Sequence, residues 1–407
     1  MKIQRCNGMN DLPPERMQIF RFIEDTCREC FTGWGYREIR TPVIEHLHLF
    51  TSAGTLTPDR ISKVYSFLDW DGWSGERVVL RPDGTIPVAR LYTEYMTGQT
   101  ARLFYVTNIF LYDEVGDNSR ERWQCGAELI GAGSPLADAE LILMSQEMLR
   151  NLGLTDVTIK LSHGGVIQGL LNKLKLNPVE QAKMFERILD GDSDALAEAT
   201  KNEPALERAI KPLVRLKGRS EGFLRNQAAV LSDNMHDIKQ LLENFAATVK
   251  VLDEIGINYE IDLSSGAGFE YYTGVIFSLY NDGIKIGGGG RYDALIPAMG
   301  GGEKPAAGFA LYMNRLMERL TLDISEDFIP EKTSLQITDG SELSRAVSFA
   351  EELRLAGYIV ELGFEGTENT SWVLKPTADN RFIICSQDGE RSYVCDTPQE
   401  ALRWMEE

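Results

Sequence analysis

Four consecutive glycines occupy residues 287–290, directly after an expected strand at residues 284–286 and before Arg291, Tyr292 and Asp293. Because glycine has no Cβ atom, the backbone here can turn freely and can approach a ligand closely. The spacing excludes a P-loop, since no lysine and hydroxyl pair follows, and it excludes the GxGxxG pattern of dinucleotide-binding folds. Taken alone, the run indicates a tight bend at a sheet edge better than it indicates a ligand site.

Length and composition exclude several classes of protein. A chain of 407 residues is long enough for two domains with room for an inserted third. No apolar run approaches the roughly 20 residues of a membrane helix, and the polar N-terminal residues do not resemble a signal peptide. The six cysteines are scattered, which is typical of a reducing compartment, so we expect a cytoplasmic protein. The net charge of −19 disfavours nucleic acid as a partner unless one domain carries a local basic patch.

The order of the expected elements indicates an α+β fold with an antiparallel sheet and helices on one side. An amphipathic helix is predicted over residues 14–35, where apolar residues recur at helical spacing after two prolines. Residues 164–251 read as almost wholly helical and contain no cluster of catalytic residue types. Strands are expected at residues 36–39, 43–50, 63–68, 77–80, 101–112, 121–130, 258–263 and 271–279, and further helices at residues 85–94 and 137–152.

Two domains follow from this order. We predict a first domain over residues 1–325 with a helical insertion at residues 165–250, and a small α/β domain over residues 330–407. The second domain is expected to begin with a strand and a helix at residues 341–356, and to end with strands and a helix.

Five ordered segments resemble the motifs of histidyl-tRNA synthetases and their paralogues, over about residues 8–320. They are residues 35–45, similar to class II motif 1; residues 81–85 (RPDGT), similar to the RPEGT loop; residues 123–131, similar to the second half of motif 2; residues 270–274 with 289–293, similar to the paired histidine-recognition motifs; and residues 308–315, similar to motif 3. The resemblance implies the class II synthetase fold, an antiparallel sheet flanked by helices.

The resemblance also implies a histidine pocket. Bound histidine needs acceptors for its ammonium group and a partner for each imidazole nitrogen. Asp83, Thr85 and Gln124 match the positions that hold the amino-acid head group, and Asp83 is one methylene shorter than the family's usual glutamate. The remaining residues that we expect to contact histidine, at the ring or beside it, are Glu128, Tyr271, Tyr272, Gly289, Arg291 and Tyr292.

Two arginines of the family's adenylation chemistry are absent. Joining the histidine carboxylate to the α-phosphate of ATP builds up negative charge, which fixed cations stabilise. At the motif 2 arginine position this chain has Leu111, and at the arginine that opens the second histidine motif it has Ala267. We therefore expect no catalytic residues and no enzymatic activity of its own. Arg120, Arg122, Arg291 and the motif 3 residue Arg315 remain as cations that leave weak nucleotide binding open.

The second domain resembles an anticodon-binding domain in its first strand, helix and strand. The next helix of that domain is missing or reduced to residues 366–376. Residues 331–407 contain 15 acidic and 7 basic residues, a net charge of −8, which repels tRNA phosphates. We expect no tRNA binding.

A chain that keeps the histidine pocket and lacks the arginines of histidine activation resembles the regulatory subunits of ATP phosphoribosyltransferase. The resemblance implies a class II homodimer, assembly with the short-form catalytic subunit, and feedback inhibition of histidine biosynthesis by bound histidine. A divergent histidyl-tRNA synthetase and a stand-alone histidine-binding or RNA-related paralogue are the alternatives. We expect no cofactor and no metal, because the CxxC of Cys27 and Cys30 falls on a helix and His46 and His48 lack further ligands.

Overall fold

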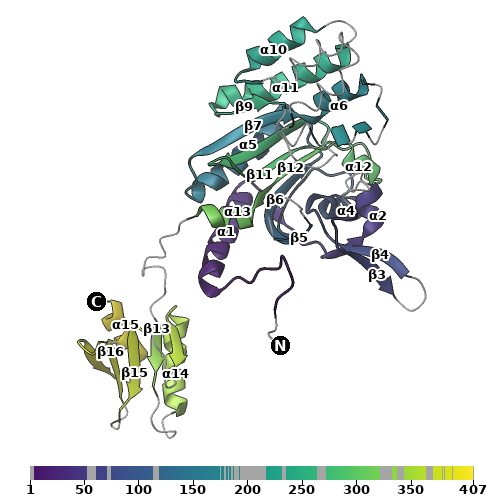
Figure 1. Ribbon diagram of the computed structural model, residues 1–407. Coiled ribbons are helices and arrows are strands. Elements are labelled where there is room, and N and C mark those ends of the chain that lie inside the picture. The colour runs from purple at the N-terminus through teal and green to yellow at the C-terminus, as the bar shows by residue number, and fades with distance from the viewer. Residues whose placement is uncertain are drawn as a thin grey trace. The chain divides into compact units, whose positions relative to one another are not determined.

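The computed structural model in Figure 1 divides the chain into two units, residues 1–321 and residues 322–407, each described here by itself. It describes residues 4–52, 61–70, 75–112, 119–174, 217–231, 235–263, 272–320, 332–336, 343–363, 370–377, 381–386 and 388–406, and the single residues 176, 177, 180, 181, 183, 184, 187, 192 and 379. Within these ranges, no helix has both the length and the apolar composition needed to cross a bilayer.

A nine-stranded sheet is the centre of the first unit. Neighbouring strands run antiparallel, except that β1 pairs with β5 and β7 pairs with β9 in parallel. The expected class II fold is thereby confirmed, as a mixed sheet flanked by helices. The strand order is β1 (Arg37–Glu38), β5 (Ala101–Phe110), β6 (Glu121–Ile130), β12 (Ala306–Tyr312), β11 (Ile284–Arg291), β10 (Val275–Asn281), β7 (Val157–His163), β9 (Glu260–Asp262) and β8 (Lys217–Gly218).

Helices α1 (Pro14–Gly33), α5 (Pro135–Asn151) and α11 (His236–Ile255) contribute to the main hydrophobic core against one face of this sheet. Helix α5 begins where Ser134 accepts a hydrogen bond from the Ala137 amide and a proline occupies the first turn. Helices α6 (Gly164–Asn172), α10 (Glu221–Val230) and α13 (Met313–Arg319) also contribute side chains to this core.

The opposite sheet face carries a second core. Helices α4 (Thr85–Tyr95) and α12 (Leu295–Ala298) pack there, around Tyr92, Tyr105 and Tyr292. Helices therefore cover both faces of the sheet, and the expectation of helices on one side was wrong. Strand β6 serves both cores, because Cys125, Ala127 and Leu129 point to the first face while Gln124 and Glu128 point to the second. The polar side chains of Gln124 and Glu128 are thus buried on the second face.

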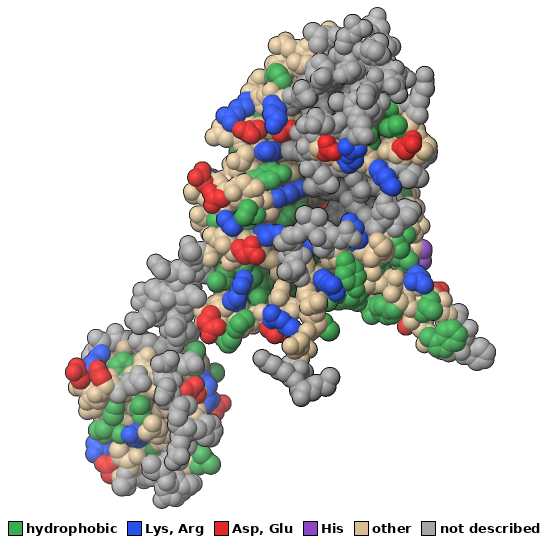
Figure 2. Space-filling view, viewed as in Figure 1, with side chains coloured by type: hydrophobic (Ala, Val, Ile, Leu, Met, Phe, Trp, Pro, Cys, Tyr) green, Lys and Arg blue, Asp and Glu red, His purple; other side chains and the backbone are tan. Residues whose placement is uncertain are grey.

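A smaller sheet joins β2 (Ile44–His46), β4 (Gly75–Leu80) and β3 (Ser66–Trp70), beside α2 (Leu47–Ser52). Several of its apolar side chains face solvent, with Leu68 57% and Trp70 70% exposed. Figure 2 shows hydrophobic side chains gathered at the β3–β4 hairpin. A hairpin with this much exposed apolar surface is typical of a protein contact.

The second unit is a five-stranded sheet with two helices, α14 (Leu343–Leu355) and α15 (Pro398–Glu406). Phe349, Trp372 and Phe382 belong to its core. Residues 372–376, within the stretch expected to hold the remnant of a helix, form strand β15, and residues 364–369 lie outside the described part. The strand order is β14 (Ile359–Leu362), β13 (Lys332–Leu335), β15 (Trp372–Pro376), β16 (Phe382–Ser386) and β17 (Ser392–Cys395).

Three expectations about elements need correction. The glycine run does not bend after a strand, because β11 continues through residues 287–290 to Arg291. Residues 47–52 are helical and cut short the strand expected at residues 43–50. Strand β7 was not predicted, although it lies inside the sheet between β10 and β9. For the inserted segment, α6, α10 and α11 are helical, and most of residues 175–216 lies outside the described part.

Candidate functional site

A pocket opens on the sheet face that carries α4. Strands β6, β10, β11 and β12 form its floor and walls, and the first turn of α4 contributes from the side. Of the residues expected to contact histidine, the lining includes Asp83, Thr85, Gln124, Tyr272, Gly289 and Tyr292. Segments from residue 83 to residue 292 thus meet around one space.

Glu128 lies directly behind this wall, with no exposed surface. Its carboxylate accepts hydrogen bonds from the hydroxyls of Thr85, at 2.7 Å, of Tyr105, at 3.3 Å, and of Tyr292. Burial raises the pKa of Glu128 to about 8, although these three hydroxyls favour the charged form. A carboxyl group in this state can accept a proton from a ligand or donate one to it near neutral pH.

Asp83 is a second buried carboxyl group, 3% exposed, at the start of α4. Its Oδ1 accepts a hydrogen bond of 2.8 Å from the Ile86 amide, so the side chain also caps the helix. Burial raises the pKa of Asp83 to about 6, against the stabilising effect of the backbone amides. Two acidic groups so deeply buried favour a cationic ligand group, because its charge would replace the solvation that they have lost.

Glycines make room for these side chains. A methyl group at Gly308 on β12 would overlap the Glu128 carboxylate, and one at Gly126 on β6 would overlap the Tyr105 ring. At Gly289 it would overlap the Gly308 carbonyl oxygen of the neighbouring strand. Residues 287–290 are not among the glycines with positive φ, so these positions require glycine for space and not for backbone conformation.

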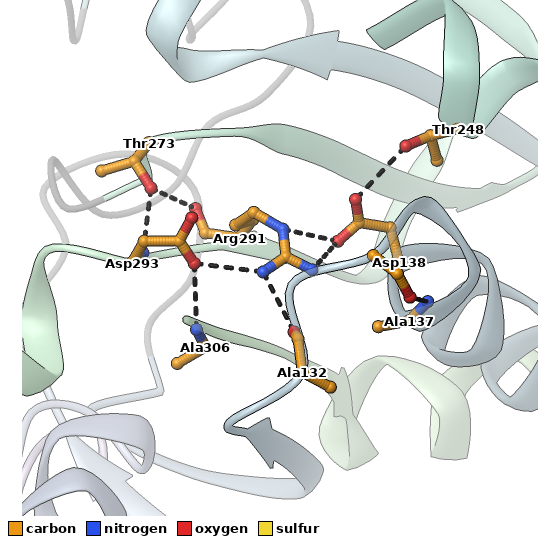
Figure 3. Close-up of polar contacts among 9 residues, drawn as sticks. Ala132, Ala137, Asp138, Thr248, Thr273, Arg291, Asp293 and Ala306 are labelled. Atoms are coloured by element: carbon orange, nitrogen blue, oxygen red, sulfur yellow. Dashed lines mark hydrogen bonds and ion pairs between the residues drawn. The ribbon is translucent and has the colours of Figure 1, made fainter. Parts of the chain in front are cut away.

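Arg291 contributes to a different site, which Figure 3 shows in close-up. Its guanidinium group pairs with Asp138 of α5, at 2.6 Å, and with Asp293, at 3.1 Å. Asp138 in turn accepts a hydrogen bond of 3.3 Å from Thr248 of α11. The structure therefore places the Arg291 side chain in a buried network that joins β11 to two helices, and does not bring it to the pocket wall with the other expected contacts. Tyr271 lies outside the described residues.

Four polar residues of the pocket wall were not predicted as contacts: Tyr105, Ser278, Lys285 and Tyr312. Tyr105 stands opposite Gly126 in the β5–β6 register, and a glycine facing a tyrosine across a strand pair is a signal that could have found it. The positions of Ser278 and Lys285 on the pocket wall depend on the pairing of β10 with β11, which no local sequence pattern indicates.

Of the two positions where the family has adenylation arginines, the structure describes one. Leu111 is half-buried and packs against the core that contains Tyr105, while Ala267 lies outside the described residues. The expected substitute cations have other contacts. The Arg120 guanidinium lies 4.6 Å from the centre of the Tyr112 ring, Arg122 donates to the Ser119 carbonyl oxygen at 3.2 Å, and Arg315 pairs with Glu318 at 3.3 Å.

No group of three or more His, Cys, Asp or Glu residues that could hold a metal ion was found among the described residues. Cys27 and Cys30 are buried in α1 as free thiols. Burial and the Glu147 carboxylate raise the pKa of Cys30 to about 12, which leaves this thiol protonated at neutral pH.

Comparisons with known proteins identify the family to which the chain belongs. A family model described as histidyl-tRNA synthetase matches residues 8–316. A Dehalococcoides mccartyi protein named ATP phosphoribosyltransferase regulatory subunit is 49% identical, over 94% of this chain and 93% of its own length. A Methanocaldococcus jannaschii protein named histidine–tRNA ligase is 34% identical, over 89% of this chain and 86% of its own.

Among solved structures, one from Bacillus halodurans, titled as an ATP phosphoribosyltransferase regulatory subunit/histidyl-tRNA synthetase, has a TM-score of 0.76. The match covers 91% of this chain and 94% of that one, at 24% sequence identity. At this identity the likeness shows the fold alone.

Proposed function

We propose that this chain, which belongs to the histidyl-tRNA synthetase family, is a regulatory subunit of ATP phosphoribosyltransferase that binds histidine without activating it. The observation that carries the proposal is the combination of a pocket beside two buried acidic groups with Leu111 where the family has an arginine. The 49% identical relative with the regulatory name supports the same reading.

Histidine suits the pocket chemically. Its ammonium group is the cation that buried Asp83 favours, with Thr85 and Gln124 as further polar partners. Its imidazole ring can exchange protons and hydrogen bonds with Glu128 and the Tyr272 and Tyr292 hydroxyls, because Glu128 titrates near neutral pH. Tyr271 remains a proposed contact beside them.

The loss of fixed cations argues against a synthetase. Each guanidinium group aimed at a transferring phosphate contributes several kcal/mol of transition-state stabilisation, so replacing two of them lowers the rate by many orders of magnitude. The acidic second unit, with a net charge of −8 over residues 331–407, adds a surface that repels tRNA. The alternative, a divergent histidyl-tRNA synthetase, is supported by the relative named histidine–tRNA ligase, which is 34% identical to this chain.

Feedback regulation then follows from linkage. Histidine binds one quaternary state of the assembly better than another, and the difference in affinity shifts the population toward the inhibited state. The partner is the short-form catalytic subunit, and the exposed hairpin residues Leu68 and Trp70 support a homodimer. The buried free thiols of Cys27, Cys30 and Cys125 fit a reducing, cytoplasmic setting.

The test uses the purified chain and the short-form catalytic subunit. Gel filtration is expected to show a complex, and histidine is expected to inhibit phosphoribosyl transfer in the complex more strongly than in the catalytic subunit alone. A Tyr292→Phe variant, which loses the hydroxyl bonded to Glu128, should weaken that inhibition. Absence of both a complex and any rate change would overturn the proposal. Histidine-dependent exchange of pyrophosphate into ATP would instead support the synthetase reading.

A further inference from the structure

We infer that Lys285 and Ser278 form the subsite for the carboxylate of the amino-acid ligand, in the place of the lost arginine chemistry. The inference rests on the proposed histidine binding and adds to it how the chain distinguishes an amino acid from its decarboxylated amine. Three independent features of the pocket carry it: its charge distribution, a bulge in β11, and a buried hydroxyl without a partner.

A ligand carboxylate in this acidic pocket needs a positively charged side chain beside it. Histidine is a zwitterion, and Asp83 on the pocket wall attracts its ammonium group and repels its carboxylate. The family's second arginine position holds Ala267 in this sequence. Among the pocket-lining residues that the structure describes, Lys285 is the one lysine or arginine.

A β-bulge aims Lys285 at the pocket. Gly288 pairs with Ser278 and Gly287 with Leu279, but the next pair is Lys285 with Tyr280, so Ile286 is left over. In a regular strand, Lys285 and Gly288 would point to opposite faces, since they are three residues apart. The extra residue puts both on the face that carries Ser278, and bulges of this kind commonly redirect a side chain at a functional site.

The side chain of Lys285 passes beside Gly288. A Cβ atom at this position would lie 3.5 Å from the Lys285 Cε and 2.7 Å from the Phe277 carbonyl oxygen. The aliphatic part of Lys285 thus passes Gly288 at van der Waals distance. A side chain at position 288 would overlap the Phe277 carbonyl oxygen of β10, so this position needs glycine for close strand approach.

The Ser278 hydroxyl has no hydrogen-bond partner among the described residues, although it is fully buried. A buried hydroxyl group without a partner costs stability, so it is expected where a ligand supplies the missing bond. Ser278 lines the pocket and pairs with Lys160 on its other side, whose ammonium group lies 5.1 Å from the centre of the Tyr280 ring. A second positive charge on the same sheet face strengthens the attraction for a carboxylate.

The test compares L-histidine with histamine, which has the same ring and ammonium group but no carboxylate, by calorimetric titration of the full chain. For Lys285→Met, the affinity for histidine is expected to fall about 10- to 100-fold, because a charge-assisted hydrogen bond is lost. The affinity for histamine should stay the same. Ser278→Ala should weaken histidine binding less, and Lys285→Arg should restore most of it.

Lys250→Met is the matched control, since Lys250 pairs with Glu254 on the surface of α11 and is expected to leave both affinities unchanged. If Lys285→Met, folded by circular dichroism, weakens both ligands equally or neither, the carboxylate subsite is wrong while the histidine pocket stands. If the wild-type chain binds histamine and histidine equally well, the subsite is also wrong. Failure of the wild-type chain to bind either ligand would instead overturn the proposed function.

Discussion

At the scale of single residues, the pocket depends on two carboxyl groups whose pKa values burial raises, to about 6 for Asp83 and about 8 for Glu128. Glu128 is surrounded by three hydroxyls and Asp83 by the first amides of α4, yet desolvation outweighs these bonds in both cases. In the absence of a cation, such groups reduce the stability of the folded chain once they ionise. A bound ligand that carries a positive charge would recover that stability.

Glu128 should make the folded chain less stable as the pH rises. Its pKa is raised from 4.5 to about 8 on folding, so its favourable contribution is complete below pH 4.5 and is lost as the pH rises through about 8. Between pH 6 and pH 8 we expect the free energy of unfolding, from urea titration, to fall by about 2–3 kcal/mol from this group. In Glu128→Gln that part of the fall should be absent. An identical pH profile for both chains would contradict the buried state of Glu128.

At the scale of elements, the β11 strand holds the site together. Its glycines let β10 and β12 approach, its bulge directs Lys285, and its last residue, Arg291, pairs with Asp138 of α5. The same strand also fixes the neighbouring chain, because the Arg291 carbonyl oxygen accepts hydrogen bonds from the amides of Thr273 and Gly274. Tyr272 and Tyr292, each next to these groups in sequence, are thereby held on the pocket wall.

Gly289→Ala tests the requirement for space. The new methyl group would overlap the Gly308 carbonyl oxygen, a backbone atom that cannot move without breaking the β11–β12 pairing. We expect a loss of at least about 2 kcal/mol in the free energy of unfolding. Gly33→Ala is the control, since nothing lies within 4 Å of its added Cβ atom at the end of α1, and it should be neutral or stabilising by up to about 1 kcal/mol. Equal effects of the two changes would refute the packing argument.

At the scale of the whole molecule, the proposed assembly needs surfaces as well as a pocket. The β3–β4 hairpin presents Phe67, Leu68 and Trp70, which are 42%, 57% and 70% exposed. Val43 and Ile44 are exposed on the adjoining segment, within the stretch that resembles motif 1. Exposed apolar side chains on neighbouring segments of a chain with a net charge of −19 favour a specific protein contact over a bare surface.

The double variant Leu68→Ser/Trp70→Ser should dissociate the proposed homodimer. Removing two exposed apolar side chains reduces the area that association can bury, so sedimentation should show monomers at concentrations where the wild-type chain is dimeric. Leu355→Ser is the control, because Leu355 is 83% exposed on α14 of the other unit and should leave the dimer intact. A wild-type chain that sediments as a monomer at micromolar concentrations would exclude the dimer itself.

The sequence alone determined the class II fold and indicated six of the residues that line the pocket. Asp83, Thr85, Gln124 and Glu128 lie in segments whose order and spacing match a family, and local motifs of this kind survive without knowledge of the contacts. The replacement of an arginine by Leu111 was also predicted from the sequence, because the loss of a charged side chain follows from the residue type alone.

The tertiary structure alone decided where Arg291, Tyr105 and Lys285 belong. Arg291 pairs with a carboxylate 153 positions away, so its role depends on helix packing that its neighbours in sequence do not reveal. Tyr105 reaches Glu128 through cross-strand register, and Lys285 faces the pocket because one residue is left over in β11. A single bulge reverses which side of a sheet a residue occupies, and the alternation of apolar and polar residues does not report it.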